Sequence, residues 1–260
     1  MRVDFCLPAK NEALILKDNL GKLLAYCQQA DFNFSWRIVG VINGSSDSSA
    51  AIFKELKERF PDQVDYAVIQ ESGRGHALKR YWGSSPADIL AYMDADLAVS
   101  LADIPGLIQP LIDNTSDLTI GSRLSAGAAV ERSWYRDIIS YSYNFLSRLL
   151  LDHHFLDLQC GFKAIRRPAF QSIHPFLQDD YWFFDTELII LAARLGYRVQ
   201  EVPVDWHENR YRRRATTVKL LRDSLSFLNN LWHFRRRLAR LKECFESAGD
   251  RPSESRHRLK

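Results

Sequence analysis

The stretch "ADILAYMDADLAVS", residues 87–100, joins an apolar run to two carboxylates that lie one residue apart. The run between Asp88 and Asp94 is short and uncharged, which predicts a buried β-strand. Residues i and i+2 of a strand point to the same side, so Asp94 and Asp96 are expected to present both carboxylates to one point, with Ala95 turned away. Two negative charges so close repel each other, which indicates a cation between them.

This strand continues an alternation of short apolar runs with longer amphipathic ones. The apolar runs are VDFCLP, WRIVGVI and VDYAVI, and the amphipathic ones cover residues 11–30, 46–60 and 75–82. Such alternation predicts an α/β fold with a mostly parallel central sheet flanked by helices. Further on we expect helices over 134–151 and 186–195 and a strand in YRVQEVPV. Ligands bind beyond the carboxyl ends of such strands, so the polar residues there are expected to converge on one crevice.

The carboxyl-terminal part of the chain is strongly basic. Residues 210–240 hold ten Lys or Arg and one acid, so they carry +9, while the rest of the 260 residues carries −6 of the net +3. At helical spacing among these cations stand Leu221, Leu225, Leu228 and Trp232, which predicts an amphipathic helix. Two interpretations stay open: the apolar stripe packs against the rest of the protein, or the helix binds a polyanion such as phosphate groups or an anionic membrane surface.

We therefore divide the chain into an α/β domain over 1–207, a basic amphipathic helical extension over 208–245 and a tail over 246–260 that is expected to be disordered. Four scattered cysteines form no CxxC pair, which indicates a reducing, cytoplasmic compartment. No targeting segment is visible, and no run approaches the roughly 18 to 20 apolar residues of a membrane span, so any membrane contact is expected to be peripheral. No nucleic-acid-binding module is recognisable.

A hard divalent cation is the usual partner of two adjacent carboxylates. Mg²⁺ or Mn²⁺ binds oxygen ligands and commonly uses one or two carboxylates together with substrate phosphate oxygens. We therefore predict a metal site at Asp94 and Asp96. The alternative is structural, with Asp96 as a helix cap and Asp94 as a turn residue.

Nine segments, in this order, carry a resemblance to a known family. They are LPAKNE, NGSSDSS, GRGHALK, DADLAVS, IGSR, the spacing of Arg136, Ser140 and Asn144, DLQCGFK, FFDTELIILAARLGYRVQEVPVDW, and the basic tract after it. The chain resembles family 2 glycosyltransferases of the GT-A fold, most of all their polyprenyl-phosphate branch of dolichol-phosphate mannosyltransferases and dolichyl-phosphate β-glucosyltransferases. The resemblance covers about residues 1 to 230 and implies a metal-dependent, inverting transfer of a hexose from a UDP- or GDP-linked sugar to a polyprenyl phosphate at the cytosolic face of a membrane.

The resemblance also implies roles for particular residues. The nucleotide-sugar donor would be bound by Pro8, Ala9, Asn11, Glu12, Asn43, Ser45, Asp47, Asp94, Ala95 and Asp96. The acceptor would be bound by Arg123, Arg136, Ser140, Asp157 and Gly161. Asp94, Asp96, Arg123 and Arg136 would be catalytic. A further phosphate contact is assigned ambiguously to Arg213, Arg214 or Lys219.

The acceptor chemistry separates the alternatives. A lipid phosphate is already anionic near neutral pH and needs no general base, whereas a hydroxyl acceptor does. For a hydroxyl, the base could be Asp157, Asp185 or Glu187, the last two of which are equally well explained as acids at a helix start. Arg123 could also pair with Asp117 or Asp137. Two alternative functions stay open: transfer to a hydroxyl of a glycan or small molecule, and a non-catalytic nucleotide-sugar-binding scaffold. An integral membrane protein as a partner also stays open.

Overall fold

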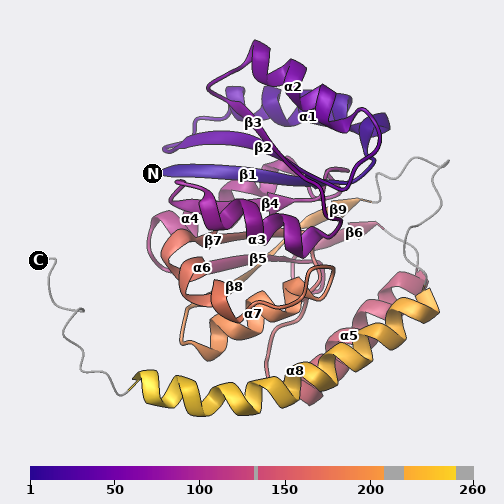
Figure 1. Ribbon diagram of the computed structural model, residues 1–260, viewed down its shortest axis with the longest axis vertical. Helices are drawn as coiled ribbons and strands as arrows, with labels where there is room; N and C mark the ends of the chain where they lie inside the picture. The colour runs from indigo at the N-terminus through magenta and orange to yellow at the C-terminus, as the bar shows by residue number, and fades with distance from the viewer. Residues whose placement is uncertain (132–133, 208–219, 250–260) are drawn as a thin grey trace, which may run out of the picture.

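The computed structural model describes residues 1–131, 134–207 and 220–249. In this part of the chain, a seven-stranded sheet has the order β3-β2-β1-β4-β7-β5-β8 (Figure 1). Its strands are β1 (Arg2–Ala9), β2 (Ser35–Asn43), β3 (Val64–Ile69), β4 (Ile89–Met93), β5 (Leu118–Ser122), β7 (Phe162–Arg166) and β8 (Val199–Pro203). Neighbouring strands are parallel except at β7, which is antiparallel to both β4 and β5. The predicted α/β, mostly parallel sheet is confirmed.

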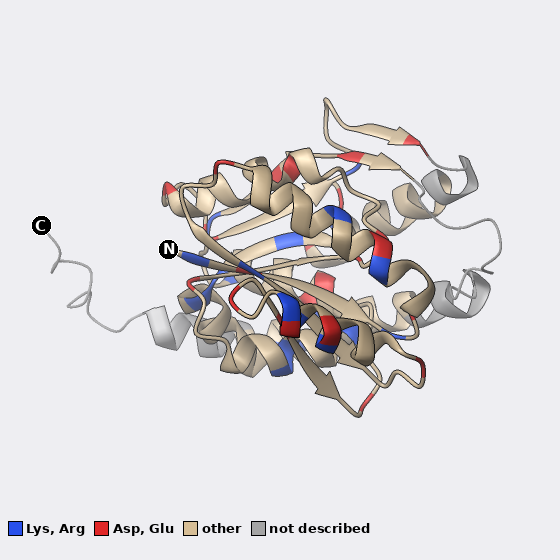
Figure 2. Cartoon of the chain, turned by 90° about the horizontal axis from the view of Figure 1, so that it is seen from above, with Lys and Arg blue, Asp and Glu red and all other residues tan. Residues whose placement is uncertain are grey.

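Helices cover both faces of the sheet and enclose two hydrophobic cores. One core includes Leu20, Phe53 and Leu107, which come from helices α1 (Ala13–Gln29), α2 (Ser49–Arg59) and α4 (Ile104–Ile112). The other core lies under α3 (Arg74–Ser84), α5 (Trp134–Leu151), α6 (Arg167–Ile173), α7 (Phe184–Arg194) and α8 (Leu220–Gly249). Most charged residues lie on helices and loops, and the strands are largely uncharged, as expected for a sheet buried on both faces (Figure 2).

Smaller elements complete the fold. Strands β6 (Ala129–Glu131) and β9 (Asp205–His207) form a separate parallel pair. Two 3-10 helices, η1 (Leu101–Asp103) and η2 (His174–Phe176), precede α4 and follow α6. The helices expected over 75–82 and 186–195 begin slightly earlier than expected, at Arg74 and Phe184.

The basic helix α8 packs on the α/β part of the chain through a face that the predicted stripe did not include. Leu231 and Phe234 are buried in the second core, and Phe227, Leu238 and Leu241 pack against it. These positions recur every three or four residues and therefore form one face of the helix. In contrast, Leu228 and Trp232 of the predicted stripe are exposed.

Other expectations about this region are corrected or fall outside the description. Residues 246–249 were expected to open a disordered tail, but they continue α8. The boundary at 208, the tail from 250 onward, and the side chains of Leu221 and Leu225 lie outside the described residues. Of the helices in the described residues, none has both the length and the hydropathy needed to cross a membrane.

Candidate active site

The loops that follow β1 and β2 are locked together at the carboxyl edge of the sheet. The Ser45 hydroxyl accepts a hydrogen bond from the Asn11 amide at 3.0 Å and donates to the Ala9 carbonyl at 3.2 Å. The Asn11 side-chain oxygen accepts from the Ser46 amide at 2.8 Å. Asn11 and Gly44 both have positive φ angles, which are the conformations that asparagine and glycine adopt most easily.

Asp47 ties the starts of two helices to this edge. Its carboxylate accepts from the Ala13 amide at 2.9 Å, where α1 begins, and from the Ser49 amide at 3.0 Å, where α2 begins. Burial alone would raise the pKa of Asp47, but these hydrogen bonds lower it below its ordinary value. Asp47 is thus held as an anion at the positive ends of two helix dipoles.

Asn43 links the same edge to α3. Its amide nitrogen donates to the Ala9 carbonyl at 3.3 Å, and its side-chain oxygen accepts from the Gly73 amide at 3.3 Å. The structure therefore brings together the predicted donor residues of the first two loops, Pro8, Ala9, Asn11, Glu12, Asn43, Ser45 and Asp47. Several of their polar groups fix the loops that shape the site.

The predicted carboxylate pair lies in a turn, which corrects the strand geometry expected from the sequence. Strand β4 ends at Met93, and the Leu97 amide donates to the Asp94 carbonyl at 3.0 Å, with Leu97 at a φ of +50°. Strand alternation therefore does not explain how Asp94 and Asp96 are oriented. The Asp96 carboxylate accepts from the Ala98 amide at 3.2 Å, and Asn19 of α1 donates to the Ala95 carbonyl at 2.9 Å.

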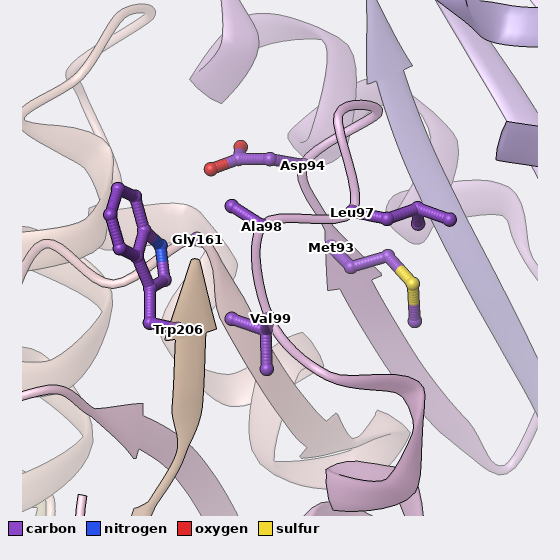
Figure 3. A pocket seen from close by; sticks show the side chains of 7 residues that line it. All are labelled: Met93, Asp94, Leu97, Ala98, Val99, Gly161 and Trp206. Atoms are coloured by element: carbon purple, nitrogen blue, oxygen red, sulfur yellow. The ribbon is translucent and has the colours of Figure 1, made fainter. Parts of the chain in front are cut away.

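Gly161 makes room for the Asp94 carboxylate. The Asp94 amide donates to the Gly161 carbonyl at 3.1 Å, and a Cβ on Gly161 would collide with the carboxylate of Asp94. Together with Trp206 the two residues line a pocket whose other walls are Met93, Leu97, Ala98 and Val99 (Figure 3). Gly161, which was assigned to acceptor binding, therefore lies directly beside the predicted metal ligand.

Arg123 and Asp157 form a buried, two-pronged ion pair. Arg123 Nε donates to Asp157 Oδ2 at 2.7 Å and Nη2 donates to Oδ1 at 2.9 Å. The pairing of Arg123 with Asp117 that the sequence left open is not formed, because Asp117 pairs with Arg198 instead. Burial alone would raise the pKa of Asp157, but the charge and hydrogen bonds of Arg123 lower it to about 2.

A second ion-pair cluster, which the sequence analysis missed, joins Asp94 to the interior. Arg74, at the start of α3, contacts Asp94 Oδ1 at 3.3 Å through Nη1 and hydrogen-bonds Asp185 through Nη2. Asp185 also accepts from the Tyr92 hydroxyl and lies 3.1 Å from Lys163 Nζ. Arg74 stood in the glycine-rich segment GRGHALK, but nothing in the sequence indicated that a residue near position 185 would face it.

Other predicted residues are placed only in part. Ser140 lies on α5, where its backbone oxygen accepts from the Asn144 side chain at 2.9 Å. The Asn144 side-chain oxygen accepts from the Leu158 amide at 3.1 Å and so ties α5 to the Asp157 loop. The side chain of Arg136, in the first turns of α5, lies outside the description. So do the three ambiguous phosphate contacts, Arg213, Arg214 and Lys219.

The residues around Asp94 fit a divalent cation. In this structure the Asp94 carboxylate already faces a cation, the Arg74 guanidinium, and 42% of its side chain is exposed. Asp94 and Asp96 supply the hard oxygen ligands that Mg²⁺ and Mn²⁺ prefer. Among the described residues no group of three or more His, Cys, Asp or Glu side chains could hold a metal. A metal on this pair would therefore complete its coordination with oxygens from a ligand or water.

Comparisons with known sequences match this chain to one family. Residues 4–173 match the family described as Glycosyl transferase family 2. Over 225 residues the chain is 32% identical to the glycosyltransferase AglD of Haloferax volcanii, which covers 86% of this chain and 35% of that protein. Over 224 residues it is 30% identical to the dolichyl-phosphate beta-glucosyltransferase of Saccharomyces cerevisiae, covering 78% of this chain and 66% of the relative. The chain thus spans only part of both relatives.

Solved structures share the fold. Glucosyl-3-phosphoglycerate synthase from Mycobacterium tuberculosis in complex with UDP matches with a TM-score of 0.64 and 17% identity, over 90% of this chain and 80% of that one. The same synthase with Mn²⁺, UDP and phosphoglyceric acid matches with a TM-score of 0.62 and 16% identity, over 89% and 78%. The predicted GT-A fold is confirmed.

Replacement of Asp94 or Asp96 by Ala is expected to abolish Mn²⁺ binding, because each removes one of the two protein oxygen ligands of the predicted site. Titration of Mn²⁺ followed by electron paramagnetic resonance measures this directly. Asp62→Ala removes an exposed carboxylate elsewhere and serves as the control. Undiminished Mn²⁺ binding in both Asp94→Ala and Asp96→Ala would rule out the site.

The Asp157–Arg123 pair is expected to make stability depend on pH in acid. The pKa of Asp157 is about 2 in the folded protein, below the value of about 3.9 expected when unfolded. Its stabilisation is therefore complete above about pH 4 and is lost as the pH falls toward 2, an effect on the order of 2 kcal/mol. Urea unfolding between pH 5 and pH 2.5 should show a steeper loss for the wild type than for Asp157→Asn. Equal slopes for the two proteins would contradict this.

Proposed function

Because the chain belongs to glycosyl transferase family 2, we propose that it transfers a hexose from a nucleoside diphosphate sugar, UDP- or GDP-linked, to a polyprenyl phosphate, with inversion at the sugar. Relatives named dolichyl-phosphate beta-glucosyltransferases support the acceptor class. Those of Saccharomyces cerevisiae and Trichomonas vaginalis are 30% and 29% identical to this chain. The observation that carries the proposal, however, is the state of three carboxylates in the structure.

All three carboxylates that could have served as a general base are already engaged. Asp157 is paired with Arg123 and has a pKa of about 2, so it is a poor proton acceptor near neutral pH. Asp185 is buried among Arg74, Tyr92 and Lys163. A hydroxyl acceptor would thus find no base among these candidates, whereas a phosphate acceptor needs none.

The third carboxylate is occupied by helix α8. Glu187 accepts from the backbone amides of Gln178 at 2.7 Å and Asp179 at 2.8 Å, and from Arg237 Nη2 at 2.5 Å. This arrangement uses Glu187 to fasten α8 and the 178–179 segment to α7. Because these three contacts occupy the Glu187 carboxylate, Glu187 is not available as a general base.

The acceptor phosphate would be bound by arginines. We assign this role to Arg123 and Arg136, and a further phosphate contact to Arg213, Arg214 or Lys219. Asp157 takes up Nε and Nη2 of Arg123 and so orients the guanidinium. The remaining nitrogen would then meet the incoming anion. Trp206, whose ring centre lies 6.0 Å from the Arg123 guanidinium, borders the same pocket as Asp94. Acceptor and donor groups would thus meet beside Asp94.

The donor would be bound at the carboxyl ends of β1, β2 and β4. Its base and ribose are assigned to the loops of Asn11 and Ser45, and its diphosphate to the turn of Asp94 and Asp96. A Mg²⁺ or Mn²⁺ ion on these carboxylates, when bound, supplies positive charge to the departing diphosphate. Arg74 adds a guanidinium beside the same turn. A bound, oriented pair of reactants is then the main requirement for transfer.

The proposed function is tested with a panel of UDP- and GDP-sugars against undecaprenyl and dolichyl phosphate, with products identified by mass. We expect a hexosyl polyprenyl phosphate, a loss of turnover on chelation with EDTA, and no transfer to simple glycan hydroxyls. Transfer to a hydroxyl would favour a glycan or small-molecule acceptor, and donor binding without any turnover would favour a non-catalytic nucleotide-sugar-binding scaffold.

Arg136→Lys is expected to raise the KM for the acceptor phosphate and leave the donor KM unchanged, because lysine cannot form a two-pronged contact.

We also propose that the protein binds peripherally at the cytosolic face of a membrane, through neighbouring faces of α5 and α8. On α5, the side chains of Ile138, Tyr141, Phe145 and Leu149 are 55 to 68% exposed. They are spaced three and four residues apart and so form one stripe. An exposed apolar stripe of this kind is typical of an interaction surface.

The adjacent face of α8 combines apolar and cationic side chains. The two helices lie side by side, with the rings of Tyr143 and Phe227 5.1 Å apart (Figure 1). Leu228 and Trp232 are exposed, and the Arg236 guanidinium lies 4.4 Å from the Trp232 ring centre. Exposed cations beside apolar side chains complement an anionic lipid surface. Arg237 is excluded from this role because it pairs with Glu187.

Reversal of charge at Arg236 and Arg240 is expected to weaken binding to anionic vesicles by roughly tenfold or more, since each arginine near such a surface contributes about 1 kcal/mol. Sedimentation with phosphatidylserine vesicles at low and high salt measures the effect. The variant Lys54→Glu/Arg59→Glu makes the same charge change on α2 and is the matched control. Equal losses in both double variants, or no binding at low salt, would contradict this surface.

A further inference from the structure

We infer that Arg74 is an internal counter-ion of Asp94. When a metal binds Asp94, it displaces Arg74 from that carboxylate, and Arg74 then binds the donor diphosphate. This inference rests on the proposed nucleotide-sugar donor. The starting observation is that Arg74 bridges two carboxylates of different character. Asp94 lies at the pocket with 42% of its side chain exposed, whereas Asp185 is fully buried. Arg74 itself is 9% exposed.

Arg74 is held by two aromatic rings and by a buried carboxylate. Its guanidinium lies 4.2 Å from the ring centre of Trp182 and 5.6 Å from that of Tyr92. Its Nη2 hydrogen-bonds Asp185, which Lys163 and the Tyr92 hydroxyl also contact. Because Asp185 is buried and has several partners, its contact with Arg74 is expected to persist when a ligand binds.

The contact with Asp94 is the weaker of the two. Arg74 Nη1 lies 3.3 Å from Asp94 Oδ1, at the long end of the range for a charge-assisted hydrogen bond. Asp94 is also the more exposed partner, so water screens this pair more than the buried one. A divalent cation at Asp94 would therefore replace the Asp94 contact while Arg74 stays on Asp185.

Once that contact is released, Nη1 needs another anion. An arginine guanidinium stays protonated in proteins, so Arg74 keeps its charge. Among the described residues its Nε is buried without a hydrogen-bond acceptor. A guanidinium that is buried away from water requires a compensating anion. Phosphate oxygens that share a metal with Asp94 would come close to the same nitrogen.

The charges around Arg74 favour joint binding of metal and diphosphate. In the structure Arg74 and Lys163 balance Asp94 and Asp185, so Asp96 is the one predicted metal ligand whose negative charge lies outside this balance. A metal alone would add two positive charges beside Arg74, which opposes metal binding. Metal together with diphosphate adds a compensating anion, so the two ligands are expected to bind more tightly together than singly. Arg74 would thus couple metal binding to donor binding.

The test measures two affinities that should move in opposite directions in Arg74→Met. Without nucleotide, Mn²⁺ should bind about fivefold more tightly, because a competing ion pair worth about 1 kcal/mol is gone. At saturating Mn²⁺, UDP or GDP, whichever the wild type binds, should bind roughly tenfold or more weakly, because a charge-assisted hydrogen bond to phosphate is lost. Electron paramagnetic resonance and calorimetry give these values without any turnover.

Lys79→Met is the matched control, because Lys79 lies on the same helix, carries the same charge and pairs with Asp180 at 2.8 Å. It should leave both affinities nearly unchanged. Arg74→Gln, which retains polar atoms beside Asp185, is measured alongside in case Arg74→Met does not fold. The inference would be overturned if Arg74→Met bound Mn²⁺ no more tightly than the wild type, or bound the nucleotide as well as the wild type does. It would also be overturned if Lys79→Met showed the same gain in Mn²⁺ affinity, or if the wild type bound no Mn²⁺. Absence of transfer to a polyprenyl phosphate, with both shifts present, would contradict only the proposed acceptor.

Discussion

The reversed direction of β7 is the constraint on which the site depends. Strands β1, β2 and β4 run parallel and end at one edge, so the loops after them meet there. Because β7 is antiparallel to β4 and Met93 pairs with Phe162, the segment that enters β7 begins at that same edge. Gly161 therefore lies beside Asp94, and the Asp157 loop lies beside Arg123. If β7 ran parallel to β4, Gly161 and Asp157 would lie at the opposite edge of the sheet.

Several charged groups around that edge form ion pairs. Arg123 is neutralised by Asp157, and Arg74 with Lys163 is neutralised by Asp94 with Asp185. Taking charged groups out of water is costly unless each has a partner, so these pairs fix one another's positions strongly. The consequence for function is that Asp157, Asp185 and Glu187 are each engaged by a cationic side chain.

Helix α8 carries two different apolar faces. One, including Leu231 and Phe234, closes the second core, and the Arg237–Glu187 pair fastens it to α7. The other exposes Leu228 and Trp232 beside arginines. The two interpretations of a basic amphipathic helix are therefore compatible, because a helix can pack through one stripe and present another. In Figure 1, α8 lies along α5, so the exposed stripes belong to neighbouring helices.

Local sequence patterns were sufficient to predict the α/β class, the long helix from Trp134 to Leu151 and the polar residues that end β1, β2 and β4. Hydrophobic periodicity and turn chemistry act over a few residues, so they can be read from the sequence. The tertiary structure decided what those residues contact. It placed Asp94 and Asp96 in a turn rather than a strand, paired Arg123 with Asp157 and brought Arg74 to Asp185 across 111 residues. Such contacts depend on strand order and direction, because a charge that is buried takes the partner that the packing of distant segments brings within reach.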